Sequence, residues 1–363
     1  MKAVILHENI EWAELQFSKE LQNRGIECTL HDIRDLDEGK IKELLEMNPD
    51  LVLNRVYPSV AYRDYHNNIK ALTLMKEFEN NDIFCVNSYQ TTKADYSKHK
   101  SAAMMDYNGV STPKTLYFSK YEYDIGKIED FVALHGFPLI MKRDIGGRGR
   151  DISLIESKEQ LYRQVIRVLL EVQSDNYEAG YVLQEFIHPV RNHDCRIAII
   201  DGKFVFSYGR TLIPRPGFSE IPWLASVSNC SQIIPYSPSE EEIELAIKAT
   251  SAIGALFNEV DMTFSSKGPM IIENNPSPNY DPGEEELIEK AVSLILAKIG
   301  DKVVKESQNA FNNIMGVIEH LRPDFAIVSL KLIKDSEPKK FGKYITKFKG
   351  LNTIVQKYGK FVL

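Results

Sequence analysis

The sequence predicts an α/β fold, in which an N-terminal parallel sheet covered by helices precedes further strands and helices. Three observations lead to this expectation. Short apolar segments alternate with helical segments over residues 1–95, which is the pattern of parallel strands joined by crossover helices. A glycine-rich loop, residues 145–150, separates two apolar segments. Two further apolar segments, residues 259–264 and 270–275, flank a short polar turn, as in a hairpin.

The N-terminal region is expected to hold four short strands and the helices between them. The third strand ends just before Asn54 and Arg55, and ligands of parallel sheets bind beyond the carboxyl ends of the strands. Arg55 is therefore either a substrate contact or part of a surface salt bridge, and the salt bridge is slightly favoured. The expected strands are residues 3–6, 27–31, 50–53 and 84–86, with helices ending near Arg24 and covering residues 41–47 and 71–80.

The composition is that of a globular protein and excludes several classes. The chain has 363 residues, of which 43% are hydrophobic and 26% charged, and its formal net charge is -7. An acidic chain is not expected to bind nucleic acid. Four separated cysteines without a CxxC pair argue against a disulfide framework or a zinc site. The apolar run at the N-terminus is too short for a signal peptide, and no run is long enough for a membrane span. The cytoplasm, without a membrane partner, is the expected location.

The loop at residues 145–150 has the composition of a phosphate-binding loop. Strands are expected on either side of it, at residues 138–142 and 152–155. Glycines let backbone N–H groups approach phosphate oxygens closely, and Lys142 at the end of the first strand would neutralise phosphate charge. The loop matches neither a Walker A loop nor a GxGxxG turn that opens a helix. A glycine-rich turn without a ligand is common, so the loop alone is weak evidence.

The other elements continue the alternation of helices and strands. His188, His193 and Cys195 are close in sequence, but no fourth ligand is evident, so a metal site built from these residues is not expected. The expected helices are residues 96–108, 159–172, 240–257 (capped by Ser237 or Ser239) and 285–299, and the expected strands are residues 181–187, 194–200 and 203–208.

The hairpin near residue 270 predicts a site for a hard metal ion. Glu273 and Asn275 are two residues apart in a strand and therefore share one face. The hairpin would bring Asp261 beside Glu273. Two carboxylates and an amide oxygen suit Mg²⁺, which proteins bind through one or two carboxylates together with substrate phosphates. A polar strand end before a proline-rich turn is the alternative, and these residues alone do not decide between the two.

The segment from Lys331 to Leu363 has a charge opposite to that of the whole chain. Nine lysines stand there against Asp335 and Glu337. A solvated helical face is the usual cause of such an excess. A docking surface for an acidic partner, such as a carrier protein or a peptide, is the functional alternative.

The order of these motifs resembles that of the ATP-grasp superfamily, in its ribosomal-S6-modification-like (RimK/LysX-type) branch of carboxylate–amine ligases. A lysine on a helix before Gly109 comes first, and a strand that ends in lysine and a glycine loop follow. The most specific motifs come next, at residues 184–187, 194–196 and 273–278. The resemblance covers about residues 1–300.

The resemblance implies a role for each matching residue. Lys98, with Lys100 as a competitor, and Lys142 would bind the phosphates of ATP. Arg196 and Arg210 would act near the transferring phosphoryl group. The glycine loop residues that would cover ATP are Gly146, Gly147, Arg148 and Gly149; Gln184, Glu185, Phe186 and Ile187 would read adenine, Asp194 would lie at the ribose, and Asp261, Glu273 and Asn275 would hold magnesium.

The resemblance also implies a domain organisation, cofactors and partners. The parts would be an N-terminal α/β domain (1–95), a small ATP-grasp subdomain with the glycine loop (96–178), a large subdomain with the magnesium site (179–300) and a C-terminal extension (301–363). The nucleotide would lie between the two subdomains. The cofactors would be ATP and two Mg²⁺ ions, for which Mn²⁺ can substitute. The chain would act as a homo-oligomer.

The implied activity is ligation of a substrate carboxylate to an amine through an acyl phosphate, with release of ADP and phosphate. The substrates would be amino acids, peptides or carrier proteins. An ATP-grasp-type kinase that phosphorylates a hydroxyl, such as an inositol phosphate kinase, is the alternative, and a nucleotide-binding regulator without catalysis is a third reading. Two departures from the family pattern are Asp151, where another glycine is usual, and residues 223–229, which match the substrate-side loop only in part.

Overall fold

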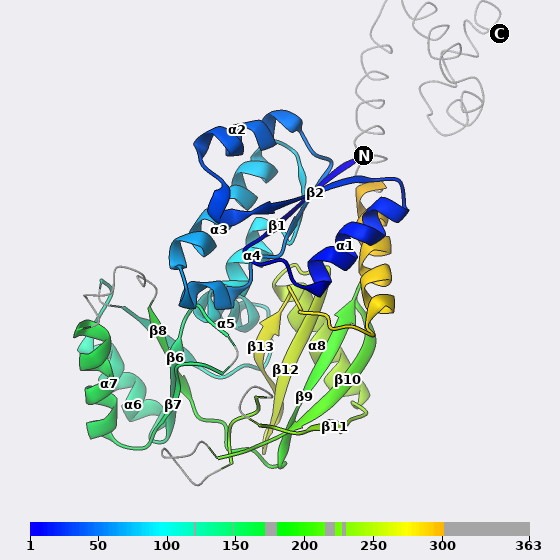
Figure 1. The fold of residues 1–363 in the computed structure, drawn as a ribbon. Coiled ribbons are helices and arrows are strands. Elements are labelled where there is room, and N and C mark those ends of the chain that lie inside the picture. The colour runs from blue at the N-terminus through cyan, green and yellow to red at the C-terminus, as the bar shows by residue number, and fades with distance from the viewer. Residues whose placement is uncertain (120, 148, 171–179, 215–221, 227–229, 301–363) are drawn as a thin grey trace, which may run out of the picture. The chain divides into compact units, whose positions relative to one another are not determined.

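The computed structural model describes residues 1–119, 121–147, 149–170, 180–214, 222–226 and 230–300. Residues Met1–Ile295 form one compact unit, and Leu296–Leu363 form a second. The described strands of the first unit form three sheets (Figure 1). Arg148 and the lysine-rich segment 331–363 lie outside the described residues, so the expectations for them stay predictions.

The first sheet is parallel, as the alternation of strands and helices predicts. Its strand order is β2-β1-β3-β4, and every neighbouring pair is parallel. Asp37 and Asp64 start two of its helices by accepting hydrogen bonds from the backbone N–H groups of Lys40 and His66. The elements of this region are β1 (Lys2–His7), α1 (Trp12–Asn23), β2 (Glu27–Asp32), η1 (Ile33–Asp35), α2 (Glu38–Met47), β3 (Leu51–Asn54), η2 (Pro58–Tyr62), α3 (Tyr65–Asn80) and β4 (Phe84–Val86).

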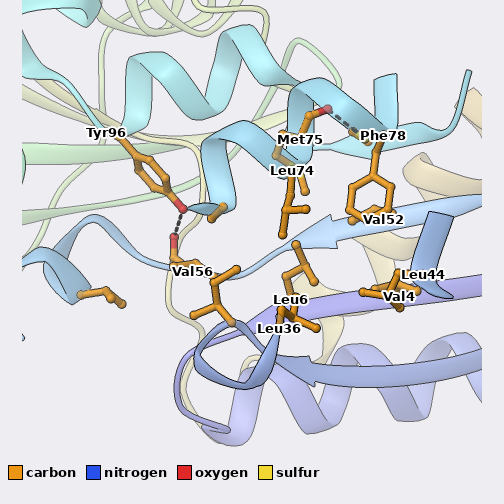
Figure 2. Close-up of a cluster of buried hydrophobic side chains, with 14 of the residues drawn as sticks. Val4, Leu6, Leu36, Leu44, Val52, Val56, Leu74, Met75, Phe78 and Tyr96 are labelled. Atoms are coloured by element: carbon orange, nitrogen blue, oxygen red, sulfur yellow. Dashed lines mark hydrogen bonds between the residues drawn. The ribbon is translucent and has the colours of Figure 1, made fainter. Parts of the chain in front are cut away.

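An apolar core joins this sheet to the helices that cover it. Figure 2 shows Val4, Leu6 and Val52 of the strands together with Leu74 and Phe78 of α3. All five are buried. Val4 and Leu6 are two residues apart, which places their side chains on the same face of the sheet. Burial of each such side chain stabilises the fold by about 1.5–3 kcal/mol relative to leaving it exposed. This core therefore fixes the strands whose ends lead to the site.

Tyr96 extends the same core and fixes the chain beyond β3. Its ring is 2% exposed. Its hydroxyl donates a hydrogen bond to the carbonyl oxygen of Val56 (Figure 2) and accepts one from Asn54 Nδ2 at 3.1 Å. Because Asn54 ends β3 and Val56 follows it, these bonds hold the segment that continues to Tyr57.

The second sheet is antiparallel and carries the glycine loop. Its order is β5-β8-β6-β7, and Lys142 of β6 pairs with Ile152 of β7 across the loop. The predicted strand–loop–strand hairpin is therefore confirmed. α6 and α7 lie on one side of this sheet (Figure 1), where Ile128 and Leu161 pack against Leu139. The elements are β5 (Thr115–Phe118), α6 (Ile125–His135), β6 (Leu139–Arg143), β7 (Ile152–Ile155), α7 (Lys158–Leu170) and β8 (Tyr181–Glu185).

The third sheet is antiparallel, with the order β11-β10-β9-β12-β13. Ala246 and Ala249 of α8 pack against Ile197 and Val260 of its strands. Ser239 caps α8 in a reciprocal capping box with Glu242. The elements are α4 (Tyr89–Asp95), α5 (Lys98–Tyr107), β9 (His193–Ile200), β10 (Lys203–Thr211), β11 (Ile233–Pro235), α8 (Glu240–Ala252), β12 (Phe257–Ser265) and β13 (Gly268–Asn275). Residues 285–300 are helical.

Two helix predictions are wrong at their ends. The helix predicted for residues 240–257 stops at Ala252, because Gly254 adopts a left-handed conformation (φ +69°) and Phe257 already begins β12. The helix predicted for residues 96–108 begins at Lys98. Ser97 caps it by accepting a hydrogen bond from the backbone N–H of Lys100.

The expectations about membrane spans and disulfide bonds can be compared with the structure over the described residues. In the described ranges every helix is too short or too polar to cross a bilayer. The four cysteines, all within these ranges, are free thiols. The division of the chain into four parts stays a prediction.

Candidate functional site

A cavity of about 390 Å³ collects residues from the second and third sheets and from the segments around the first sheet. Lys142 and Gln184 reach it from the second sheet, Arg196 and Asp261 from the third, and Tyr57 from the segment after β3. The predicted site residues that line this cavity are Lys142, Gly146, Gly147, Gly149, Gln184, Glu185, Phe186, Ile187, Asp194, Arg196, Arg210, Asp261, Glu273 and Asn275.

The register of the third sheet explains why its charged residues meet. Arg196 of β9 lies opposite Tyr208 on one side and opposite Asp261 on the other. Asp261 in turn lies opposite Glu273 of β13. Residues directly opposite each other across strands project from the same face of the sheet. The predicted hairpin is thus confirmed, and it places the Asp261 and Glu273 carboxylates side by side.

Asp261 is the centre of a buried ion-pair network. Arg196 donates to both of its oxygens, at 2.6 and 3.0 Å, and Arg210 Nη2 lies 3.1 Å from Oδ2. Arg196 also contacts Glu259 at 3.2 Å, and Arg210 holds Asp194 with two hydrogen bonds of 3.0 and 2.5 Å. Burial alone would raise the pKa of Asp261, but Arg196 and Arg210 outweigh it and lower that pKa to about 2. Asp261 is therefore a stable anion.

Lys98 and Glu273 form a second ion pair beside this network. Lys98 Nζ lies 3.1 Å from Glu273 Oε1 and donates to the carbonyl oxygen of Gly146 at 2.7 Å. Lys98 thereby joins the glycine loop to the strand that carries Glu273. Burial disfavours the ionised form of Glu273, yet Lys98 and then Lys142 outweigh it, so the pKa of Glu273 is lowered. Lys100, the competing candidate, is exposed.

Lys142 differs from Lys98, because it has no carboxylate within ion-pair distance among the described residues. It is 4% exposed and lines the cavity. Burial lowers the pKa of its ammonium group to about 8, and the nearby Lys98 acts in the same direction, against Glu273 and Asp261. A buried ammonium group of this kind favours an anionic ligand.

The glycine loop packs against η2 of the N-terminal region. Gly146 has φ +149°, and a Cβ atom there would lie 2.5 Å from the Tyr62 hydroxyl oxygen. That hydroxyl donates to the carbonyl oxygen of Arg150 at 3.2 Å. Asp151, the departure noted in the sequence, forms an ion pair with Arg143, whose Nε atom lies 2.7 Å from Asp151 Oδ2. Only glycine allows this close approach of the loop to Tyr62.

The end of β8 forms another wall of the cavity. The side-chain amide of Gln184 donates to Thr115 Oγ1 at 2.7 Å. The backbone N–H of Glu185 donates to the carbonyl oxygen of Lys114, and the Glu185 carboxylate accepts from the Lys114 N–H, both at 3.0 Å. Ile140 and Ile152 add apolar surface there. An apolar wall beside ordered backbone suits a planar ring system.

Sequence reasoning missed a wall that the N-terminal region contributes. Tyr57, Pro58, Ser59 and Asp95 line the cavity. The first three follow β3, and the rule that ligands bind beyond strand ends could have indicated them. Asp95 lies at the end of α4, and no local motif marks it.

Arg55 corrects an expectation. It forms an ion pair with Glu14 at 3.0 Å, but it is 1% exposed, so the pair is buried and the predicted surface position is wrong. Arg55 also donates to the Tyr57 hydroxyl, which donates to Glu14 at 2.8 Å and lies 3.1 Å from Asn279 Oδ1. Arg55 therefore fixes Tyr57 at the cavity and does not line the cavity itself.

The donor set at the cavity is compatible with a hard cation. The described residues contain no cluster of three or more His, Cys, Asp or Glu side chains suited to a metal. The predicted set differs from such a cluster, because it consists of two carboxylates and the amide of Asn275. The Asn275 amide nitrogen donates to the carbonyl oxygen of Glu259 at 3.0 Å, which leaves its oxygen for another partner. All three side chains line the cavity.

Comparisons with known proteins agree with this geometry. Residues 95–299 match the family described as the RimK-like ATP-grasp domain. A probable alpha-L-glutamate ligase of Shewanella pealeana is 29% identical over 234 residues, which are 64% of this chain and 46% of that protein. Another, from Coxiella burnetii, is 26% identical over 257 residues, 70% of this chain and 77% of that protein. The chain thus spans less than half of the first relative and about three quarters of the second.

The fold resembles that of solved structures. D-cycloserine synthetase DcsG superposes with a TM-score of 0.62 at 15% identity, over 82% of this chain and 99% of that one. At this identity the likeness concerns the fold. The predicted fold class, α/β of the ATP-grasp type, is confirmed.

Proposed function

Because the chain belongs to the RimK-like ATP-grasp family, we propose that it is an ATP-dependent ligase that joins a carboxylate to an amine. One observation carries the proposal. The glycine loop, Lys142 and the Asp261–Glu273 pair, which come from separate parts of the sequence, meet in one cavity, and Lys98 pairs with Glu273 beside it. Phosphate-binding cations and carboxylates for a hard metal ion are both required when a nucleotide is the phosphoryl donor.

The proposed position of ATP follows from the chemistry of the cavity walls. The adenine lies at Gln184–Ile187 with Ile140 and Ile152 beside it. The triphosphate lies under the glycine loop, where Lys142 supplies a positive charge that has no ion pair among the described residues. Lys98 holds the loop to β13 through Gly146 and Glu273. The proposed ribose contact of Asp194 competes with its two hydrogen bonds to Arg210.

Asp261, Glu273 and Asn275 are the proposed holders of Mg²⁺, in two sites for which Mn²⁺ can substitute. When bound, magnesium neutralises phosphate charge. In the structure Arg196 and Arg210 compensate Asp261, and Lys98 compensates Glu273. These cations keep both acids ionised, which is the form that a hard metal ion requires.

The proposed reaction has two steps. A carboxylate oxygen of the substrate attacks the γ-phosphorus of ATP, and the bond to the β-γ bridging oxygen breaks, so ADP leaves with the electron pair. The amine nitrogen then attacks the acyl carbon, the bond from that carbon to the phosphate oxygen breaks, and the nitrogen loses a proton. Arg196 and Arg210 offset the charge of the transferring group. The loop held by Tyr62 excludes water from the acyl phosphate.

The proposed substrates are amino acids or peptides, and L-glutamate is the first to test because both relatives are named as glutamate ligases. Binding of an acidic carrier protein or peptide at the lysine-rich segment 331–363 and assembly as a homo-oligomer belong to the same proposal. So does a cytoplasmic location.

The kinase alternative is not favoured. Such a kinase needs cations that are free to bind a phosphorylated substrate. Arg55, Arg63 and Arg196 each contact an acidic residue in the structure, and Arg210 contacts Asp194 and Asp261. Arg215 lies outside the described residues. Arg196 and Arg210 are assigned to the transferring phosphoryl group, and Arg55 and Arg63 are paired with acids, so none of these four is left for a phosphorylated substrate.

A phosphate-release screen tests the proposed function. The full chain is incubated with Mg·ATP and L-glutamate paired with amino acids, dipeptides and carrier proteins, and products are identified by mass spectrometry. Free phosphate that requires both a carboxylate and an amine is the expected result. A stable phosphoester product would instead establish the kinase.

A further inference from the structure

The carboxyl groups that line the cavity differ in whether a cationic side chain balances their charge. Among the described residues, Glu273 contacts Lys98, Asp261 contacts Arg196, and Asp194 contacts Arg210. The remaining two are Glu185, which lies 3.4 Å from His135 Nδ1, and Asp95. Within the same part of the chain Asp95 has no ion pair, and its buried Oδ2 atom has no hydrogen-bond partner.

The surroundings of Asp95 offer it a neighbouring hydroxyl group and no counter-ion. The hydroxyl group of Ser277 acts to lower the pKa of the Asp95 carboxyl group. Asn87 Nδ2 donates to Ser277 Oγ at 2.8 Å, and this orients the hydroxyl. Lys98 and Arg55 act on Asp95 only from a distance, because their ion pairs are with Glu273 and Glu14.

The local backbone also fails to stabilise a negative charge at this position. Asp95 is the last residue of α4. The carboxyl end of a helix carries partial negative charge, so an anion there is unfavourable. A carboxylate placed against this dipole, with one oxygen buried and unbonded in the described structure, costs stability. A cationic ligand in the cavity would offset that cost.

The residues around Asp95 separate this part of the cavity from the nucleotide wall. Asp95 lies beside the loop that follows β13, where Ser277 and Asn279 also line the cavity. Tyr57 is fixed to Asn279 from the N-terminal region. Gln184–Ile187, which form the proposed adenine wall, come from the second sheet. The part of the cavity near Asp95 therefore belongs to different elements.

We propose that Asp95 binds the ammonium group of the acceptor amine, which gives one proton to solvent before its nitrogen attacks the acyl carbon. Aliphatic amines are largely protonated at neutral pH, and such a cation supplies the counter-ion that Asp95 lacks among the described residues. This inference rests on the proposed ligase function and deepens it, because it makes the amine substrate a cation that is held by the N-terminal region. Asp95 is thus a binding residue for the second substrate, and ATP does not require it.

Two reactions of the full chain separate amine binding from carboxylate activation. The first uses Mg·ATP, L-glutamate and the partner that supports turnover in the screen. The second replaces the amine with hydroxylamine, which is uncharged at neutral pH and traps an acyl phosphate as a hydroxamate. The variants are Asp95→Asn, which keeps the shape, and Asp95→Glu, which keeps the charge. Asp106→Asn is the control, because Asp106 is exposed and pairs with Lys114 outside the cavity.

Asp95→Asn is expected to raise the KM for the amine about 10- to 100-fold, the effect of losing a charged hydrogen bond. The KM for ATP and the rate of hydroxamate formation should stay at the wild-type level. Asp95→Glu should recover part of the loss, and Asp106→Asn should show none. An unchanged KM for the amine, or an equal loss in both reactions, would overturn the inference while leaving the ligase function intact.

A stability measurement tests the inference without any turnover. If Asp95 lacks a structural counter-ion, Asp95→Asn should raise the melting temperature of the protein in the absence of substrates. A fall would show that the carboxylate stabilises the fold, and it would overturn the inference. If the wild-type chain released phosphate in neither reaction, the proposed ligase function itself would fail, which is a separate outcome.

Discussion

The charges on two walls of the cavity are balanced in different ways. On the third sheet, the cavity residues Asp194, Arg196, Arg210 and Asp261 and the adjacent Glu259 compensate one another through contacts of 2.5–3.2 Å; these five are the paired cluster. Asp95 and Lys142 also line the cavity but have no ion pair among the described residues; these two are the unpaired charges.

The difference separates a structural role of charge from a ligand-binding one. A buried ion pair is strongly destabilised when one partner is removed, because the other is left uncompensated. A buried charge without a partner already lowers the stability of the fold. Proteins retain such destabilising residues at sites where a bound ligand balances the charge. We therefore expect mutations of the paired cluster to damage the fold as well as the proposed chemistry, and mutations of the unpaired charges to damage function without destabilising the fold.

The largest expected effect is on the paired cluster. Arg196→Met should lower the free energy of unfolding by about 3–5 kcal/mol, because it leaves Asp261 and Glu259 without their shared cation. Urea denaturation measures the change. Arg191→Met is the matched control, because Arg191 pairs with Glu242 at 3.2 Å but is 42% exposed, and it should cost no more than about 1 kcal/mol. Equal losses in the two variants would contradict the comparison.

The next effect concerns Lys142. Lys142→Met should reduce ATP turnover about 100- to 1,000-fold, the usual cost of removing one charge-stabilising donor. The variant should nevertheless melt no lower than the wild type at pH 7. Burial holds the pKa of Lys142 at about 8, below its ordinary value, so the cost of its charge is fully present below pH 8 and disappears toward pH 10.5. Any gain in melting temperature should therefore shrink at high pH.

A thermal shift series from pH 7 to pH 10 gives this pH dependence, and ADP production gives the turnover. Near-normal ADP production by Lys142→Met would remove Lys142 from the proposed phosphate site. A clear loss of stability at pH 7 would mean that Lys142 belongs with the paired cluster.

A smaller effect is expected in the glycine loop. Gly146→Ala should weaken ATP binding by about 1–3 kcal/mol, because a Cβ atom would meet the Tyr62 hydroxyl and the backbone has φ +149°. Gly147→Ala is the control one residue away, where a Cβ atom would meet only Ser59 Cβ at 3.9 Å. Calorimetry with Mg·ATP compares the two. Equal affinities would show that contact with Tyr62 does not set the loop conformation.

The smallest effect is the pH dependence of the stability that the Asp95→Asn substitution adds. Burial above all, with Glu273, raises the pKa of Asp95 to about 7, against Ser277, Lys98 and Arg55. A raised folded-state pKa means that stability is lost as pH rises from about 4 to 7. In the absence of Mg²⁺ and ATP, Asp95→Asn should therefore raise the free energy of unfolding by about 1 kcal/mol at pH 8 and by less at pH 5. A gain that is the same at both pH values would show that the charge is not its cause.

The features that the sequence predicts correctly are local ones. Alternating apolar segments indicate the parallel sheet, and Glu273 and Asn275 reveal their shared face by their spacing in one strand. The motifs at residues 184–187 and 273–278 are short and contiguous, so the RimK-like ATP-grasp family could be recognised before the fold was known.

The features that the sequence does not reveal depend on contacts between distant segments. The ion pair of Arg196 with Asp261 follows from the register of β9 against β12, which no sequence pattern states. Arg55 is charged and was expected at the surface, but Glu14 from α1 compensates it inside the protein. Asp95 has no motif, and its position at the cavity depends on how α4 packs beside the loop after β13.

An isotope experiment tests the central claim, that ATP activates a carboxylate in this cavity, most directly. The carboxylate substrate is labelled with ¹⁸O at both oxygens, and the phosphate released in the presence of Mg·ATP and the amine is analysed by mass spectrometry. The account predicts one ¹⁸O atom in each released phosphate, because the acyl phosphate breaks between the acyl carbon and the labelled oxygen. Released phosphate without any label would contradict it.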